Sequence, residues 1–168
     1  MRDFARACSR PTTLTVSLRF RWLRYWVPIV GWGVVIWTLS TRTFSDIDTA
    51  QWIVPLLHWL FPIVSHRNLL RLHVWIRKGA HVTEYFVLSL LLLRGIRHGR
   101  PGWRFSWALV ALALAACWAM SDELHQTFVP NRGSSPFDVL LDVFGAAAGV
   151  VLDSWRHGGI EMTTRSRL

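Results

Sequence analysis

The sequence predicts an all-α integral membrane protein, a bundle of four transmembrane helices with an amphipathic connecting segment on the outer side. The first observation is composition, since 52% of the 168 residues are hydrophobic and 17% are charged. The second is a mean hydropathy of +0.29. The third is a set of four apolar segments with the length of about 20 residues that crosses the hydrocarbon core of a bilayer.

The first predicted helix covers residues 25–41, where YWVPIVGWGVVIWTLST runs uncharged between Arg24 and Arg42. At about 1.5 Å per residue this run spans roughly 26 Å, close to the hydrocarbon thickness of a bilayer. The basic stretch before it is typical of a signal peptide, but it is long, and no A-x-A cleavage site follows Ser40. We therefore expect an uncleaved signal-anchor helix.

Residues 43–76 connect this helix to the next one on the outer side. The segment begins polar, and its apolar residues then return in runs that are too short or too interrupted to span a bilayer. If Ser65 caps a helix, Leu69, Leu72 and Ile76 share one face, which predicts an amphipathic segment lying along the membrane surface. The alternative is a loop packed on the helix bundle, and the sequence favours neither.

Three further helices are predicted at residues 78–97, 104–122 and 136–155. The run FSWALVALALAACWAMS between Arg104 and Asp122 is uncharged, whereas the other two segments contain ionisable residues. A buried helix pair of a soluble protein would also explain those two segments. Four apolar segments in so short a chain favour the membrane interpretation.

The distribution of basic residues predicts the orientation of the helices. With both termini in the cytoplasm, thirteen of the nineteen Lys and Arg residues lie on the inner side and six on the outer side. This positive-inside asymmetry predicts a basic cytoplasmic segment at 1–24, a four-helix membrane domain at 25–155 and a cytoplasmic tail at 156–168.

Composition also excludes several function classes. A soluble nucleic-acid binder can have a net charge of +9, but it would not usually combine that charge with 11 Trp and long uncharged runs. We therefore expect no nucleic-acid partner. Cys8 and Cys117 form no CxxC pair and have no disulfide or zinc-ligand spacing. The sequence identifies no cofactor, no metal site and no protein partner.

Ionisable residues that a bilayer disfavours gather on the predicted outer side. On the second helix Lys78, His81 and Tyr85 share a face, with Glu84 at its edge and Arg77 next to Lys78. The third helix ends with Asp122, Glu123 and Gln126, the following loop supplies Arg132, and the fourth helix begins with Asp138 and Asp142. Spacings of three and four residues place most members of each group on one helix face.

The cost of burying charge in lipid gives this pattern a physical meaning. A central Asp, Lys or Arg costs about 2.5 to 3.5 kcal/mol on insertion scales, so these side chains should face one another inside the bundle. Gly145 and Gly149 form a small-xxx-small pair that would bring the fourth helix close to its neighbours. We expect His81, Asp122 and Glu123 to be acid–base groups and the other members to be ligand-binding groups. The alternative is a polar network that locks the helices together and has no other role.

Two blocks of the sequence resemble a known family. RKGAHVTEYFVLSLLLL resembles the Arg-Lys-x-x-His-x-x-x-Tyr pattern of the VanZ-like family. SDELHQTFVPNRGSSPFDVLLDVFGAAAG resembles its second signature, Ser-Asp-Glu-x-x-Gln-x-Phe-x-Pro-x-Arg, followed by Asp and a Gly-containing helix. The resemblance covers roughly Arg77 to Gly149. It departs from the family at Asp142, where Asn is more frequent, and the additional carboxylate alters what the site can bind.

The resemblance implies a small multi-pass protein of the bacterial plasma membrane. The namesake of the family is associated with low-level resistance to the glycopeptide teicoplanin. From the resemblance and the polar residues together, we expect binding or modification of a membrane lipid or a lipid-linked envelope precursor, with a link to glycopeptide resistance as one outcome. The alternative is a non-catalytic membrane scaffold. Transport is less favoured, because we expect no acidic residues in the inner half that match the outer cluster.

Overall fold

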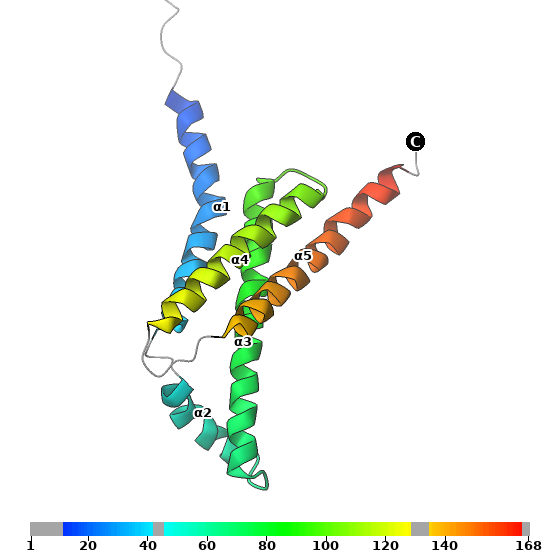
Figure 1. The fold of residues 1–168 in the computed structure, drawn as a ribbon. Coiled ribbons are helices and arrows are strands. Elements are labelled where there is room, and N and C mark those ends of the chain that lie inside the picture. Colours follow the sequence, from blue (N-terminus) through cyan, green and yellow to red (C-terminus); the bar gives the residue numbers. More distant parts are fainter. Residues whose placement is uncertain (1–11, 42–45, 129–134, 166–168) are drawn as a thin grey trace, which may run out of the picture.

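The computed structural model of the protein describes residues 12–41, 46–128 and 135–165. These ranges form five helices and no strand. The helices are α1 (Thr12–Leu39), α2 (Asp46–Leu60), α3 (His66–Arg97), α4 (Phe105–Thr127) and α5 (Pro136–Arg165) (Figure 1). The predicted all-α fold class is therefore confirmed for the described part of the chain.

The longest helix, α3, organises the fold because it contacts each of the other four helices. The main core joins Tyr85, Leu88 and Leu93 of α3 to a row of alanines on α4. The alanines at positions 108, 111, 115 and 119 are at most 3% exposed, and they recur every three or four residues along one face of α4. Small side chains at this spacing let the neighbouring helices approach closely.

The most extensive helix pairing in the described residues lies between α3 and α5. A Cβ atom on Gly145 would collide with the backbone carbonyl of Val82, and one on Gly149 would collide with the Ser89 hydroxyl. Both glycines are buried. The predicted small-xxx-small pair is thus confirmed as the contact surface of α5 with α3.

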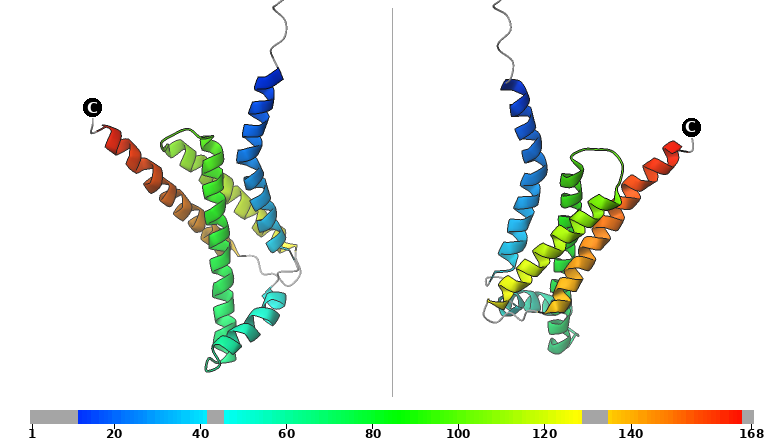
Figure 2. Two further views of the ribbon diagram at one scale, coloured as in Figure 1. Left: turned by 180° about the vertical axis from the view of Figure 1, so that it is seen from behind. Right: turned by 45° about the horizontal axis from the view of Figure 1, so that its top comes forward.

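The second feature of the fold is a hairpin formed by α2 and the first part of α3. Figures 1 and 2 show that α4 and α5 lie beside the later part of α3, while its first turns have α2 as their neighbour. Val54 and Leu57 of α2 pack on Leu69 of α3 in a small core separate from the main one. We call this unit, residues 46–76, the α2–α3 hairpin.

The predicted boundaries of the helices need correction. α1 begins at Thr12 rather than at residue 25, so half of the segment predicted as a basic cytoplasmic stretch is helical, and α5 continues to Arg165 rather than ending at 155. α4 covers Phe105–Thr127, close to the predicted 104–122. Clusters of Arg mark where a helix meets water or head groups, but they do not break the helical backbone, since Arg is a good helix former.

The predicted connecting segment is also different. The predicted helix after Ser65 is present, but residues 66–76 are the first three turns of α3 and not a separate segment. Ser65 does occupy the N-cap position in an extended conformation, without a capping hydrogen bond from its side chain. The additional helix is α2, which contains Pro55 and spans only 15 residues.

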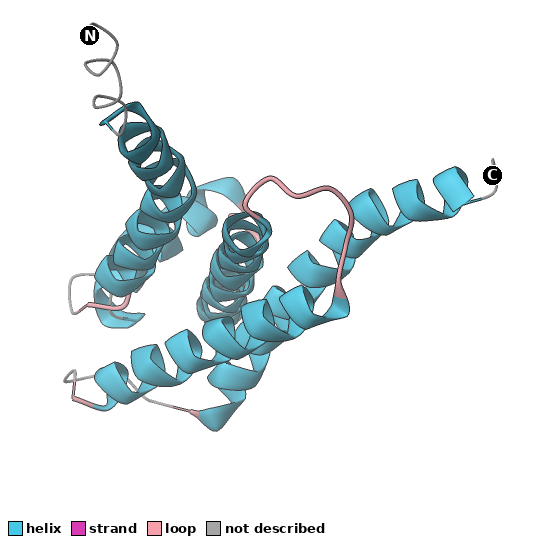
Figure 3. Ribbon diagram, turned by 90° about the horizontal axis from the view of Figure 1, so that it is seen from above, coloured by secondary structure: helices cyan, strands magenta, loops and turns pink. Residues whose placement is uncertain are grey.

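Two helices are long and apolar enough to cross a membrane by length and composition, namely α3 and α4. The prediction of four spanning segments therefore remains a prediction for α1 and α5. The start of α1, the α3–α4 connection and the end of α5 lie at the same end of the molecule (Figure 1). Seen from that end, the helices that carry the two chain ends diverge (Figure 3).

Candidate functional site

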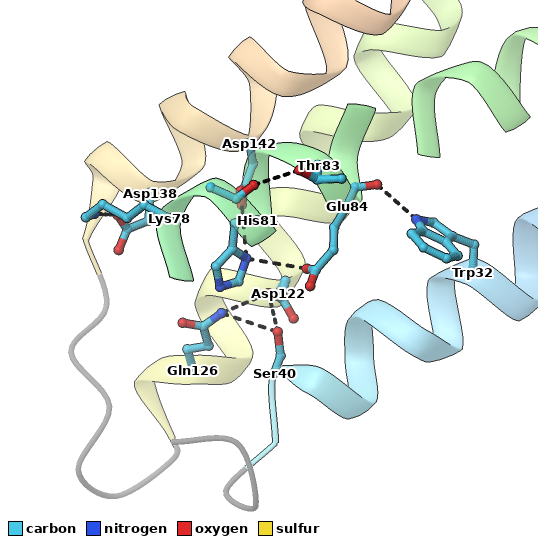
Figure 4. Close-up of polar contacts among 11 residues, drawn as sticks. Trp32, Ser40, Lys78, His81, Thr83, Glu84, Asp122, Gln126, Asp138 and Asp142 are labelled. Carbon is cyan, nitrogen blue, oxygen red and sulfur yellow. Dashed lines mark hydrogen bonds and ion pairs between the residues drawn. The ribbon is translucent and has the colours of Figure 1, made fainter. Parts of the chain in front are cut away.

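The predicted polar residues converge from three helices, α3, α4 and α5, at the end of the bundle next to the α2–α3 hairpin, and the end of α1 joins them. The end of α1, the middle of α3, the end of α4 and the start of α5 each contribute side chains (Figure 4). We call this group the outer cluster. Its described members from the sequence prediction are Arg77, Lys78, His81, Glu84, Tyr85, Asp122, Glu123, Gln126, Asp138 and Asp142.

Asp122 is the most buried carboxylate of the outer cluster, with 1% of its surface exposed. Its Oδ2 atom accepts hydrogen bonds from the Ser40 hydroxyl at 2.6 Å and from the Gln126 amide at 2.8 Å. No residue in the described ranges donates a hydrogen bond to its other oxygen, Oδ1. The carboxylate is thus held in place through one oxygen, while the second can accept a hydrogen bond from a bound molecule.

His81 lies between two carboxylates from different helices. Its Nδ1 atom is 3.6 Å from Glu84 Oε2 and 3.9 Å from Asp142 Oδ1. These distances suit an electrostatic pairing rather than a direct hydrogen bond. The backbone carbonyl of Glu84 also accepts a hydrogen bond of 2.9 Å from the Trp32 indole of α1. The imidazole is therefore positioned by charges on α3 and α5 (Figure 4).

Lys78 and Asp138 form an ion pair between α3 and α5. Their side chains are 35% and 33% exposed, so this pair lies at the accessible edge of the outer cluster. An ammonium group has three hydrogen-bond donors, and the contact with Asp138 uses one of them.

Glu123 contacts the backbone between α4 and α5. Its Oε1 atom accepts a hydrogen bond from the backbone N–H of Ser135, immediately before α5 begins at Pro136. A carboxylate at a helix N-terminus is stabilised by the exposed N–H groups and the helix dipole. This contact gives Glu123 a structural role in joining the end of α4 to the start of α5.

Tyr85 has no exposed surface and belongs to the main core. No hydrogen-bond partner for its hydroxyl lies within the described ranges, although the charges of Asp142 and Asp122 act on it. A buried hydroxyl of this kind normally finds a partner. Tyr85 therefore lies at the inner boundary of the outer cluster with an unused donor.

Two predicted residues need separate mention. Arg132 lies outside the described residues, so its place relative to the outer cluster stays a prediction. Arg77 is on α3, partly buried and engaged in an interaction.

The sequence does not predict two residues of the site, Trp32 of α1 and Ser40, which directly follows α1. Ser40 is completely buried and bonds to Asp122, and Trp32 bonds to the Glu84 backbone. Ser40 ends an apolar run, which is the one signal that could have drawn attention to it. Its partner is 82 positions away, and no sequence spacing indicates that pairing.

A second charged group lies at the opposite end of α3 and α5. Arg97 pairs with Asp153, whose side chain is 9% exposed, and His157 Nδ1 is 3.2 Å from the second oxygen of Asp153. The prediction that the inner half holds no matching acid is therefore wrong. The sequence places Asp153 in an otherwise apolar segment, and the structure shows that it lies on the face of α5 that contacts α3.

Comparison with known proteins assigns the family. A family model described as VanZ/LLP1 matches residues 25–156. The chain belongs to the VanZ/LLP1 family. No curated protein and no solved structure matched it.

The VanZ/LLP1 match includes all the residues of the outer cluster, and it ends just after the ion pair of Arg97 and Asp153. It begins at Tyr25 and thus leaves out the first turns of α1. Family membership and the two apolar helices together identify a membrane protein. Within the described ranges, no group of three His, Cys, Asp or Glu side chains is arranged to hold a metal ion.

Proposed function

We propose that the outer cluster of this VanZ/LLP1 protein binds, and modifies by acid–base chemistry, the polar group of a membrane lipid or a lipid-linked component of the bacterial envelope. The observation that carries this proposal is a set of buried polar atoms without hydrogen bonds in the described chain: Asp122 Oδ1, Asp142 Oδ1 and the Tyr85 hydroxyl. Leaving such an atom unsatisfied costs about 1–3 kcal/mol. A bound molecule with hydroxyl or amine groups would satisfy them.

The charges of the outer cluster suit an amphiphile with a mixed polar group. Lys78 is at the accessible edge and retains donors for a phosphate or a carboxylate. The buried Asp122 and Asp142 lie deeper and can accept hydrogen bonds from hydroxyl or amine groups. A lipid polar group offers both kinds of partner in one molecule.

The geometry around His81 supports acid–base chemistry. A general base must be oriented by a third group and must be reachable by the substrate. His81 is oriented by Glu84 and Asp142, and 23% of its side chain is exposed. In the proposed reaction His81 exchanges a proton with the substrate, and Asp122 holds the hydroxyl or amine that reacts.

A link to teicoplanin susceptibility belongs to the same proposal. If the ligand is a precursor of the cell envelope, its binding or modification changes the surface that the glycopeptide meets. Because the resemblance implies an association of the family with teicoplanin resistance, teicoplanin susceptibility is the phenotype to measure.

A scaffold role is the second candidate. The specific observation in its favour is the pairing of α3 with α5 at both ends, by Lys78–Asp138 and by Arg97–Asp153. In this case the polar residues stabilise the bundle and bind no small molecule. The bundle then serves as a fixed surface for partner proteins.

Asp122→Asn separates the two candidates, with Asp153→Asn as the matched control. Both positions are buried carboxylates, at 1% and 7% exposure, and the control lies at the far end of the bundle. Asparagine can still accept the bonds from Ser40 and Gln126, so the fold should remain. Co-purified lipids are measured by mass spectrometry, unfolding by heating in detergent, and envelope function by teicoplanin susceptibility of cells.

A binding site predicts that Asp122→Asn loses the co-purified lipid and the phenotype while it keeps its unfolding temperature. Asp153→Asn should keep the lipid and lose stability. If Asp122→Asn lowers the unfolding temperature in parallel with function, the scaffold is the correct interpretation. A stable, inserted Asp122→Asn variant with full function and unchanged lipid content contradicts the proposed site.

A further inference from the structure

The α2–α3 hairpin contains a groove that the proposed function does not use. The groove has a volume of about 550 Å³ and is lined largely by apolar side chains, among them Val54 and Pro55 of α2 and Leu70 and Val74 of α3. This volume falls within the range of about 300–1,000 Å³ that is usual for small-molecule sites. A groove with such a lining suits a hydrocarbon chain.

The groove exists without a ligand, because contacts within the hairpin hold its two helices in place. Val54 and Leu57 pack on the fully buried Leu69 and hold α2 against α3. His73 is 3% exposed, and its Nε2 atom lies 3.2 Å from the Thr49 hydroxyl across the two helices. These contacts fix the separation of the helices, so a chain would enter a groove that already exists.

The charge on the α3 side of the groove favours one class of ligand. The first turns of α3, from His66 to Lys78, contain Arg67, Arg71, Arg77 and Lys78 and no Asp or Glu. Arg67 and Arg71 are each three residues from a lining residue on the same helix, so they border the groove. Arg67 and Arg71 therefore favour an anionic polar group beside the apolar lining.

The position of the hairpin indicates that the ligand comes from the membrane. Trp52, Trp59 and Trp75 are 81%, 76% and 70% exposed on the hairpin. Trp residues concentrate where a membrane meets water. On α3, Val74 of the groove is four residues from Lys78 of the outer cluster, which is about 6 Å along the helix axis. The exposed Trp residues favour a place at the bilayer surface for the groove, and the spacing along α3 puts it next to the outer cluster.

We propose that the groove holds one acyl chain of an anionic phospholipid taken from the surrounding leaflet. The chain turns out of the bilayer into the groove, and the phosphate stays level with Arg71, Arg77 and Lys78. This inference rests on the proposed function, because it names anionic phospholipid as the lipid class that reaches the outer cluster. It assigns the α2–α3 hairpin to lipid capture.

Photolabelling tests the groove directly. The full chain is reconstituted in vesicles of phosphatidylcholine that contain a trace of phosphatidylglycerol with a photoactivatable group in one acyl chain. A phosphatidylcholine probe with the same chain is the comparison. Labelled peptides are then identified by mass spectrometry. We expect labels on residues 50–55 and 66–74, and more label from the anionic probe than from the zwitterionic one.

Leu70→Trp and Leu72→Trp form a matched pair for this experiment. The two leucines are 40% and 39% exposed on the same helix, but Leu72 does not line the groove. Leu70→Trp fills the groove and should lower the labelling of the hairpin about tenfold, which corresponds to about 1.4 kcal/mol. Leu72→Trp should leave it unchanged. Replacing Arg67 and Arg71 by Gln should remove the preference for the anionic probe.

The outcomes separate this inference from the proposed function. Equal labelling of all exposed helix faces, with no change in the Leu70→Trp variant, contradicts lipid binding in the groove. Cross-links between two copies of the hairpin that block the label overturn it as well, because a second chain then covers this surface. In either case an inactive, stable Asp122→Asn variant still supports the outer cluster. If the groove is labelled as expected and Asp122→Asn retains full function, the proposed function fails and the groove remains a lipid-binding site.

Discussion

Asp122 shows how a single side chain ties the first helix to the rest of the bundle. Its Oδ2 atom receives one hydrogen bond from Gln126, on its own helix, and one from Ser40, at the end of α1. The Gln126 amide lies 3.4 Å from the Ser40 hydroxyl as well. The position of α1 at the outer cluster therefore depends on a small polar contact inside an apolar surrounding.

Replacing Ser40 by Ala should destabilise the protein by about 1–3 kcal/mol, because a fully buried carboxylate loses a donor. The measurement is thermal unfolding in detergent. Thr38→Ala is the control, since Thr38 is exposed and bonds to the carbonyl of Val35 on its own helix. Equal unfolding temperatures for the two variants would show that the contact with Asp122 contributes nothing to stability.

Asp142→Asn should change which lipid is bound rather than whether the protein folds. The substitution replaces a carboxyl group 3.9 Å from His81 by an amide. It also introduces Asn, which the resemblance implies is the more frequent residue at this position. We expect the fraction of anionic lipid among co-purified species to rise while the unfolding temperature stays the same or increases. An unchanged lipid profile would mean that Asp142 does not contact the ligand.

The sequence predicts many residues of the outer cluster but few of the groups that they contact. Asp122, Gln126, Asp138 and Asp142 could be predicted because their spacing of four residues places each pair on one helix face. That Glu123 bonds to the backbone before α5 could not be predicted, since it depends on how the chain turns between α4 and α5.

Among the helices, the pairing of α3 with α5 is the most extensive contact, and glycine makes it possible. A Cβ atom added to Gly145 would meet the carbonyl oxygen of Val82 and would lie 3.0 Å from its carbonyl carbon and Cα. The obstructing atoms belong to the backbone of α3, so they cannot move aside as a side chain can. The two helices would have to separate.

Gly145→Ala should therefore lower stability by about 1–3 kcal/mol, as expected for overpacking a core. Gly79→Ala is the control on α3, because a Cβ atom there meets nothing within 4 Å. The control should be neutral or slightly stabilising, since Ala is a better helix former than Gly. Thermal unfolding of both variants decides the point, and a neutral Gly145→Ala would contradict the close approach.

Arg97→Gln should be more damaging, with a loss of about 3–5 kcal/mol, because it leaves the buried carboxylate of Asp153 without its main cation. Adding Asp153→Asn to the same chain should restore much of the loss, which a double-mutant cycle measures. Arg94→Gln is the control, since Arg94 is exposed and lies 6.0 Å from the Tyr25 ring. Additive effects of the two substitutions would exclude the pair.

The sequence predicts the central part of four helices correctly, but it does not predict where each of these helices begins and ends. The segments around 25–39, 78–97, 105–122 and 136–155 are helical as expected. The sequence does not indicate that the turns from His66 continue into the helix at 78–97, because Arg77 and Lys78 resemble a boundary, although Arg and Lys are compatible with helix. α2 was missed because its apolar run is short and contains Pro55.

The whole molecule consists of a helix bundle and a protruding hairpin, with both chain ends leading to the opposite end of the bundle (Figures 1 and 2). This arrangement agrees with termini on one side of the membrane. The side itself follows from the excess of Arg near those ends, and it stays a prediction.

The native cysteines allow a test of this orientation. In a Cys117→Ser background, Cys8 should react with a membrane-impermeant thiol reagent only after cells are permeabilised. A cysteine at position 63 is the opposite control, because Ile63 is 98% exposed in the hairpin and should react in intact cells. The reverse pattern of labelling would invert the topology and place the outer cluster in the inner leaflet.

The two ion pairs between α3 and α5 also define a length. Lys78 and Arg97 are separated by about 28 Å along α3, close to the thickness of a bilayer core. Sliding one helix past the other by a single turn, about 5.4 Å, would break both pairs at once. We therefore expect α3 and α5 to tilt as one unit when the bilayer thins or thickens, without sliding along each other. The depth of His81 and Asp142 in the leaflet would then change with the tilt angle of this helix pair.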